Sequence, residues 1–132
     1  IQAQILELLK ELTRKKGVSL IVITHNLGVV ARYADRVNVM YAGKIIECGL
    51  ARDIYHHPRH PYTLGLLHSV PRLDQPKKSK LEPIEGQPPD LARLPAGCSF
   101  RPRCKFGEER CDHEVPGLRE VGEKHFCACL KA

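Results

Sequence analysis

Residues 18–49 read VSLIVITHNLGVVARYADRVNVMYAGKIIECG, and this stretch decides the fold. It opens with the continuously apolar, β-branched run 18–23, which is typical of a strand buried on both faces of a parallel sheet. The run ends beside His25, and Asn26 is a residue type that caps helices. A helix is therefore predicted over 27–33. His25 lies where the carboxyl end of a parallel strand meets a helix, which is a common place for ligands.

The flanking segments extend this alternation of helix and strand. Alternating residues over 36–41 predict a second strand, and the pair at 42–43 predicts a tight turn that returns the chain as a hairpin with 44–48. Leu and Ile at helical spacing predict a helix over 1–16 that stops at Gly17. The expected fold class is α/β. With 5% aromatic residues, the core is expected to consist of Leu, Ile and Val.

Composition narrows the function classes. The net charge is +6 over 132 residues, which favours an ordinary Lys-rich surface over a surface for nucleic acid. The longest apolar runs are far below the roughly 20 residues that a membrane helix needs.

The chain has no Met at residue 1 and starts inside a helical pattern without a capping residue. We therefore expect a piece of a longer protein.

Proline and cysteine divide the chain. All ten prolines lie at or after Pro58, and five of the six cysteines lie after residue 97. These shifts predict four parts: an α/β part at 1–57, a docking segment at 58–72, a proline-rich linker at 73–97 with one short strand at 81–84, and a small, irregular Cys-rich terminal region at 98–132.

Residues 20–49 closely resemble the end of the nucleotide-binding domain of ABC transporters. In that family an apolar strand ends in a Thr-His pair, and a helix and an M-x-x-G-x-I-x-E-x-G hairpin follow. The resemblance implies the C-terminal piece of a P-loop NTPase domain. It also implies that His25 is the switch-loop histidine, which contacts the γ-phosphate of ATP and helps to position the attacking water.

Other parts of that machinery are missing from this sequence. It contains no G-x-x-x-x-G-K-[ST] loop, no LSGGQ signature and no acidic Walker B strand. ATP and Mg²⁺ are therefore expected to bind mainly to a part of the protein outside this chain. The chain alone is expected to be inactive as an ATPase.

Residues 54–72, IYHHPRHPYTLGLLHSVPR, narrow the resemblance further. The segment Pro-Arg-His-Pro-Tyr-Thr, followed by a Leu-rich turn and S-x-P-R, resembles the extension on ATP-binding subunits of dipeptide, oligopeptide and nickel importers. We expect a docking turn whose Tyr62 and Leu66 pack on the nucleotide-binding core. A metal site is disfavoured because prolines interrupt the helix that would align its histidines, which are His56, His57 and His60.

The terminal region holds five cysteines, which are Cys98, Cys104, Cys111, Cys127 and Cys129. Their spacing leaves three kinds of site open. Disulfides need an oxidising compartment. Zinc sites usually use C-x2–4-C pairs, which are absent here, although His113 and His125 could complete a Cys–His set. A [4Fe–4S] cluster needs four thiolates and suits an irregular spacing.

The pattern G-C-x-F-x-x-R-C, followed by a cysteine and by H-x-x-x-C, resembles the terminal region of peptide-importer subunits, where four cysteines are associated with a [4Fe–4S] cluster. The resemblance implies the ligands Cys98, Cys104, Cys111 and Cys129, with zinc as the alternative metal. Cys127 occupies a position that is usually apolar in the family, so Cys127 and Cys129 are both candidates for the fourth ligand. Four basic residues between the ligands could offset the charge of the thiolates; these are Arg101, Arg103, Lys105 and Arg110.

Together, these resemblances imply an ATP-binding subunit of an ABC importer that couples ATP hydrolysis to uptake of peptides or nickel. Its expected partners are a second ATP-binding subunit and the membrane-spanning permease subunits, and its expected place is peripheral, on the cytoplasmic face of the cell membrane. The alternative is a non-enzymatic zinc or iron–sulfur module with a regulatory or nucleic-acid role. The few aromatics and the lack of a basic helix disfavour that alternative, and no direct nucleic-acid contact is expected.

Overall fold

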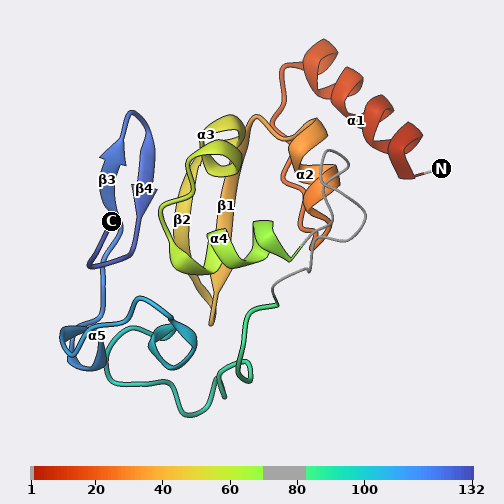
Figure 1. Ribbon diagram of the computed structural model, residues 1–132. Helices are drawn as coiled ribbons and strands as arrows, with labels where there is room; N and C mark the ends of the chain where they lie inside the picture. The colour runs from red at the N-terminus through yellow and green to blue at the C-terminus, as the bar shows by residue number, and fades with distance from the viewer. Residues whose placement is uncertain (1, 70–82) are drawn as a thin grey trace. The chain divides into compact units, whose positions relative to one another are not determined.

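A computed structural model of the chain describes residues 2–69 and 83–132, with side chains described from residue 4 onward. The chain divides into two compact units, Ile1–Asp35 and Arg36–Ala132. Figure 1 labels the helices and strands of each unit. Within the described ranges, no helix is long and apolar enough to cross a membrane. The four parts expected from proline and cysteine content remain a prediction.

The first unit contains two helices, α1 (Gln2–Lys16) and α2 (Leu27–Tyr33). As predicted, α1 ends at Gly17, whose φ of 65° lies in the left-handed region that favours glycine. The predicted cap of α2 is confirmed, because the Asn26 side chain accepts hydrogen bonds from two backbone N–H groups of the first turn.

The strand predicted over 18–23 is wrong. This segment forms neither a helix nor a strand. Its apolar side chains are exposed, with Ile21 at 88% and Ile23 at 96%. A strand buried on both faces needs a hydrogen-bonded neighbour and a cover on each side. The described residues of the first unit provide no second strand to pair with it. The apolar pattern is present, but the structure that would bury it is not.

The second unit begins with the predicted hairpin. Strand β1 (Arg36–Tyr41) pairs antiparallel with β2 (Lys44–Leu50). The turn residues Ala42 and Gly43 have φ values of 48° and 75°, which is the geometry of the two-residue turns that suit the twist of a hairpin. The sequence therefore located both strands and the turn correctly.

A second hairpin, which the sequence did not predict, completes the sheet. Strands β3 (Arg119–Gly122) and β4 (His125–Cys127) pair with each other, and β4 also pairs with β2. The described sheet has the order β1-β2-β4-β3 and is antiparallel throughout, so the expected parallel sheet is not formed. The terminal region is thus not wholly irregular. Its strands are only three or four residues long, which is too short for a clear alternating pattern.

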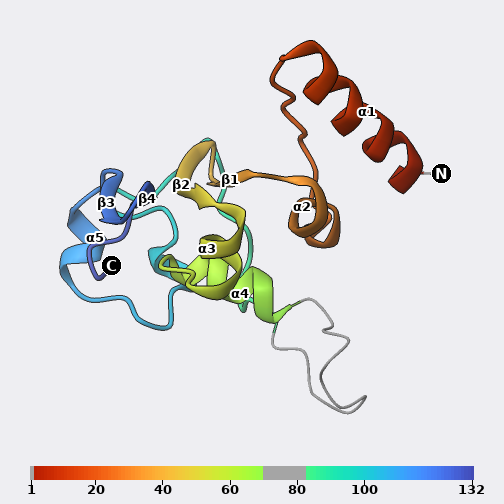
Figure 2. The same ribbon diagram turned by 90° about the horizontal axis from the view of Figure 1, so that it is seen from above.

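Two helices follow the first hairpin, α3 (Ala51–His56) and α4 (Pro61–His68). Figures 1 and 2 show them on one face of the β1–β2 hairpin. The cysteine region contains a 3₁₀ turn, η1 (Arg101–Arg103), and the short helix α5 (Arg110–His113). Half of the strand predicted at 81–84 lies outside the described residues, and its described part, 83–84, is not in a strand.

The buried centre of the second unit is aromatic, which corrects the expectation of a Leu, Ile and Val core. Tyr41 and Phe100 are buried together with Ile46, and Tyr62 packs against them. The Tyr41 ring lies 4.7 Å from that of Tyr62 and 5.2 Å from that of Phe100, measured between centroids. The predicted packing of Tyr62 on the core is therefore confirmed. Leu66, which was also predicted to pack on the core, is not part of this cluster.

This core predicts a large cost for truncating its central ring. Phe100 is 4% exposed, so Phe100→Ala should lower the free energy of unfolding by about 3–5 kcal/mol, as loss of a buried phenyl ring does elsewhere. Urea denaturation measures this change. The matched control is Phe106→Ala, because Phe106 is 53% exposed and its truncation should cost less than about 1 kcal/mol. Equal costs for the two variants would contradict the assigned core.

Candidate functional site

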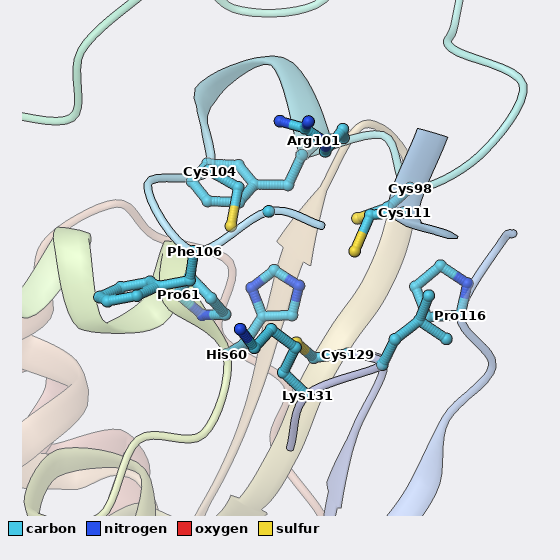
Figure 3. Close-up of a pocket in the computed structure, with 13 residues that line it drawn as sticks. His60, Pro61, Cys98, Arg101, Cys104, Phe106, Cys111, Pro116, Cys129 and Lys131 are labelled. Atoms are coloured by element: carbon cyan, nitrogen blue, oxygen red, sulfur yellow. The ribbon is translucent and has the colours of Figure 1, made fainter. Parts of the chain in front are cut away.

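The four cysteines expected to act as ligands line one pocket. Cys98, Cys104, Cys111 and Cys129 all border it, and all are free thiols. Figure 3 shows them around a shared space, with the His60 ring beside Cys129. The free space is about 360 Å³, including open solvent at its mouth. The structure thus brings together residues that lie up to 31 positions apart (129 minus 98).

The motif G-C-x-F-x-x-R-C builds the first half of this pocket. A Cβ on Gly97 would lie 2.3 Å from the carbonyl oxygen of Cys111, so only glycine allows the two segments to approach. Phe100 anchors the turn in the aromatic core. The Arg103 guanidinium donates to the carbonyl oxygens of residues 84 and 85. The backbone N–H of Cys98 then donates to the Cys111 carbonyl at 2.9 Å.

Strand β4 delivers the fourth cysteine. Cys127 pairs with Glu47 of β2, and the N–H of Ala128 donates to the carbonyl of Ile46 at 2.8 Å. Cys129 follows directly and lies at the pocket. Cys127, the last residue of β4, is fully buried and is not among the residues that line the pocket. The geometry therefore separates the two cysteines that the sequence left as candidates for one role.

Burial opposes ionisation of the thiols both in the pocket and in β4. Burial raises the pKa of Cys98 and of Cys104, and neighbouring thiols of the pocket, Cys111 and Cys129 among them, raise both further. Burial also raises the pKa of Cys127, and there the next cause is the Glu47 carboxylate. Thiols crowded in one pocket resist losing their protons unless a cation lies among them.

Two cations border the pocket, Arg101 and Lys131. Arg101 is one of the four basic residues expected to offset thiolate charge, and its Nε lies 3.0 Å from Asp112. Lys131 was not predicted and pairs with Glu108 at 2.6 Å. The other three expected residues make contacts elsewhere: Arg103 binds backbone carbonyls, Lys105 pairs with Glu85, and Arg110 binds Glu108 and the Leu130 carbonyl.

The donor set fits a metal that prefers sulfur. Four free thiols around one pocket are the ligands that Fe–S clusters and structural zinc use. In the described part of the chain, however, no three His, Cys, Asp or Glu side chains are already close enough to hold a single metal ion. The ligands would need to move together on binding, as is common where metal binding completes folding.

The buried carboxylate of Glu47, whose role the sequence did not reveal, joins the segments that lie next to the pocket. Glu47 is 0% exposed and accepts hydrogen bonds from the backbone N–H groups of Arg59, at 2.6 Å, and His60, at 3.0 Å. The ring Nε2 of His125 lies 2.8 Å from the same carboxylate. Because Glu47 occupies this ring nitrogen, His125 is engaged as a structural partner and does not line the pocket.

His60, the histidine of the His-Pro-Tyr segment, is a buried cap. It is 2% exposed, and its Nδ1 accepts the N–H of Tyr62 at the start of α4. Pro61 occupies the first turn of that helix, where its missing N–H has no cost. Burial lowers the pKa of His60 from 6.5 to about 4, although Glu47 acts in the opposite direction. His60 is therefore neutral at physiological pH.

His25 belongs to the first unit and is exposed. It directly precedes Asn26, whose side chain fixes the first turn of α2. The cysteine pocket belongs to the second unit, so the predicted site residues form two separate groups.

The family model for the oligopeptide/dipeptide transporter C-terminal region matches residues 46–111. The match covers β2 from residue 46 onward, the His-Pro-Tyr segment and three of the four pocket cysteines. It ends before β3 and β4, so it does not include Cys129.

Several curated proteins are similar to nearly the whole chain. The dipeptide transport ATP-binding protein of Bacillus subtilis is 55% identical over 98% of this chain and 38% of its own length. The oligopeptide transport ATP-binding protein of Salmonella typhimurium is 48% identical over 99% of this chain and 38% of its own length. A peptide import ATP-binding protein of Brucella ovis is also 48% identical, over 99% of this chain and 40% of its own length. The chain thus spans about 40% of the length of such relatives.

The lowered pKa of His60 predicts a pH-dependent stability. The unfolded chain binds a proton below its ordinary pKa of 6.5, whereas the folded chain stays neutral down to about 4. The contribution of His60 to the free energy of unfolding is therefore fully present above pH 6.5, and it is lost as the pH falls toward 4. From about pH 7 to about pH 5 the loss should be about 2 kcal/mol.

The variant His60→Asn keeps an acceptor for the Tyr62 N–H but does not titrate in this range. Urea denaturation at the two pH values should give a smaller loss for the variant than for the natural chain, by about 2 kcal/mol. Parallel pH dependences of the two proteins would show that His60 is not held neutral.

Proposed function

The chain belongs to the family of the oligopeptide/dipeptide transporter C-terminal region, and we propose that it is part of the ATP-binding subunit of an importer for peptides. The relatives are named for dipeptide, oligopeptide and peptide transport, and these names do not mention nickel. Peptides are therefore the substrate class that the comparisons favour. The non-enzymatic Cys-rich module has no support among them.

In this proposal ATP and Mg²⁺ bind mainly to residues outside this sequence, because the chain has no phosphate-binding lysine loop. This chain would contribute the switch-loop histidine and the terminal region. The subunit would act at the cytoplasmic face of the membrane, with a second ATP-binding subunit and membrane-spanning permeases. On its own the chain would not hydrolyse ATP.

His25 is the residue proposed to meet the γ-phosphate. Its exposure leaves the imidazole accessible to a nucleotide bound by the rest of the protein, and the capped turn of α2 restrains the backbone that carries it. An imidazole at this point can donate a hydrogen bond to a phosphate oxygen and orient the attacking water. Its contribution would be electrostatic and positional, without a covalent intermediate.

This role predicts a loss of ATP turnover in the intact protein. His25→Ala should lower kcat by about a hundredfold or more, as loss of one positioned transition-state donor does elsewhere, with a much smaller effect on ATP affinity. The control is His68→Ala, because His68 lies in α4 and outside the proposed catalytic group. Steady-state phosphate release measures both. Undiminished turnover by His25→Ala would rule out the switch-loop role.

We also propose that the cysteine pocket holds a [4Fe–4S] cluster through Cys98, Cys104, Cys111 and Cys129. The support is their shared pocket, their free thiols and the position of Cys127 away from it. A bound cluster would supply strong Fe–S bonds that tie loop segments together. Such a staple suits a region with short strands and few buried side chains. Zinc is the alternative occupant, since it also accepts four thiolates.

Metal analysis of the anaerobically purified intact protein tests this assignment. About four irons and four acid-labile sulfides per chain are expected for the cluster, and about one zinc without sulfide for the alternative. Cys129→Ala should lose most of the iron, whereas Cys127→Ala should retain it. Iron loss in Cys127→Ala with retention in Cys129→Ala would reverse the ligand assignment.

A further inference from the structure

The four pocket cysteines are held in two different ways. Cys98, Cys104 and Cys111 lie on one continuous segment, 98–111, with its own backbone hydrogen bonds, including Arg101 N–H to the Cys98 carbonyl at 2.9 Å. Cys129 comes from the other side, at the end of β4. The position of this fourth thiol therefore depends on how the second hairpin is attached to the sheet.

Two sets of contacts hold the segment around Cys129. At and after Cys129, the contacts are at the surface: Arg119 donates to the carbonyls of Cys129 and Leu130, Arg110 also donates to the Leu130 carbonyl, and Lys131 pairs with Glu108. Before it, the contacts are buried: His125 is held by Glu47, and Ala128 N–H by the Ile46 carbonyl. Exposed ion pairs contribute little because water and salt screen them, whereas buried bonds to a carboxylate are costly to break.

We propose that Glu47 is the positioning residue that places Cys129 against the other three cysteines of the pocket. The inference rests on the proposed role of these four cysteines as one metal-binding set. Glu47 binds the chain on both sides of the pocket, since Arg59 and His60 lead into α4 and His125 begins β4.

The position of Glu47 requires a side chain with two acceptor oxygens, which a carboxylate provides. Three N–H donors converge on its two oxygens, and a carboxylate only accepts hydrogen bonds. A glutamine would offer one acceptor oxygen and turn its NH₂ group toward at least one of these donors. Glu47→Gln therefore keeps the shape of the side chain while breaking part of the attachment.

The test measures the reactivity of each cysteine in the intact protein, reduced and free of metal, with iodoacetamide and mass spectrometry of the peptides. Glu47→Gln should raise the alkylation rate of Cys129 by about tenfold or more, while Cys98, Cys104 and Cys111 change by less than about threefold. The matched control is Glu108→Gln, which weakens the exposed ion pairs of Glu108 with Arg110 and Lys131 and leaves the buried contacts in place. Every rate should then stay within about threefold.

A second pair of variants tests the same attachment from the hairpin side. His125→Leu removes the donor to Glu47 and should also raise the reactivity of Cys129 selectively. His125→Gln keeps a donor nitrogen and should restore a rate close to that of the natural protein. An unchanged Cys129 in both Glu47→Gln and His125→Leu, or an equal rise at all four cysteines, would overturn the proposal. The equal rise would mean that Glu47 supports the whole fold and not one ligand.

Iron analysis of the same variants separates this inference from the cluster assignment. After anaerobic reconstitution, Glu47→Gln should hold less iron than Glu108→Gln. If the natural protein binds neither iron nor zinc, the cluster assignment fails. The alkylation pattern would still decide whether Glu47 positions Cys129, because it is measured without metal.

Discussion

The second unit depends on one buried carboxylate. Glu47 lies at the centre of three segments that are far apart in the sequence: its own strand, the turn before α4 and the start of β4. A charge without water must be matched by donors, and here the donors come from the segments that need to be joined. The aromatic cluster of Tyr41, Tyr62 and Phe100 packs β1, α4 and the turn before η1 together through apolar contact. Polar and apolar contacts thus specify one arrangement.

This arrangement explains why the His-Pro-Tyr segment has its particular residues. His60 caps α4, Pro61 starts it, and Tyr62 enters the aromatic cluster. None of these roles requires a ligand. The segment connects the β1–β2 hairpin to the cysteine region, and the wall of the pocket includes His60 and Pro61. A terminal region attached in this way is placed relative to the hairpin by packing and hydrogen bonds.

Local signals in the sequence were sufficient to predict some of the helices and strands, but not others. Asn26 and the pair Ala42–Gly43 specify a cap and a turn through their own backbone preferences, so α2 and the first hairpin were predictable. The apolar run 18–23 failed because burial of a strand depends on neighbours that the run does not encode. The role of Glu47 could not be read either, since a charged residue in a hairpin strand ordinarily faces water. Its burial is made favourable by donors that lie far away in the sequence, in Arg59, His60 and His125.

The most direct test of this account is hydrogen exchange at the amide of Ala128 in the metal-free intact protein. That N–H donates to the Ile46 carbonyl one residue before Cys129. If β4 is docked on β2 by the Glu47 carboxylate, the amide should exchange as slowly as those of the β1–β2 ladder, and exchange should quicken in Glu47→Gln. Exchange at the rate of an unprotected peptide in the natural protein would contradict the account, because Cys129 would then have no fixed position beside the other cysteines.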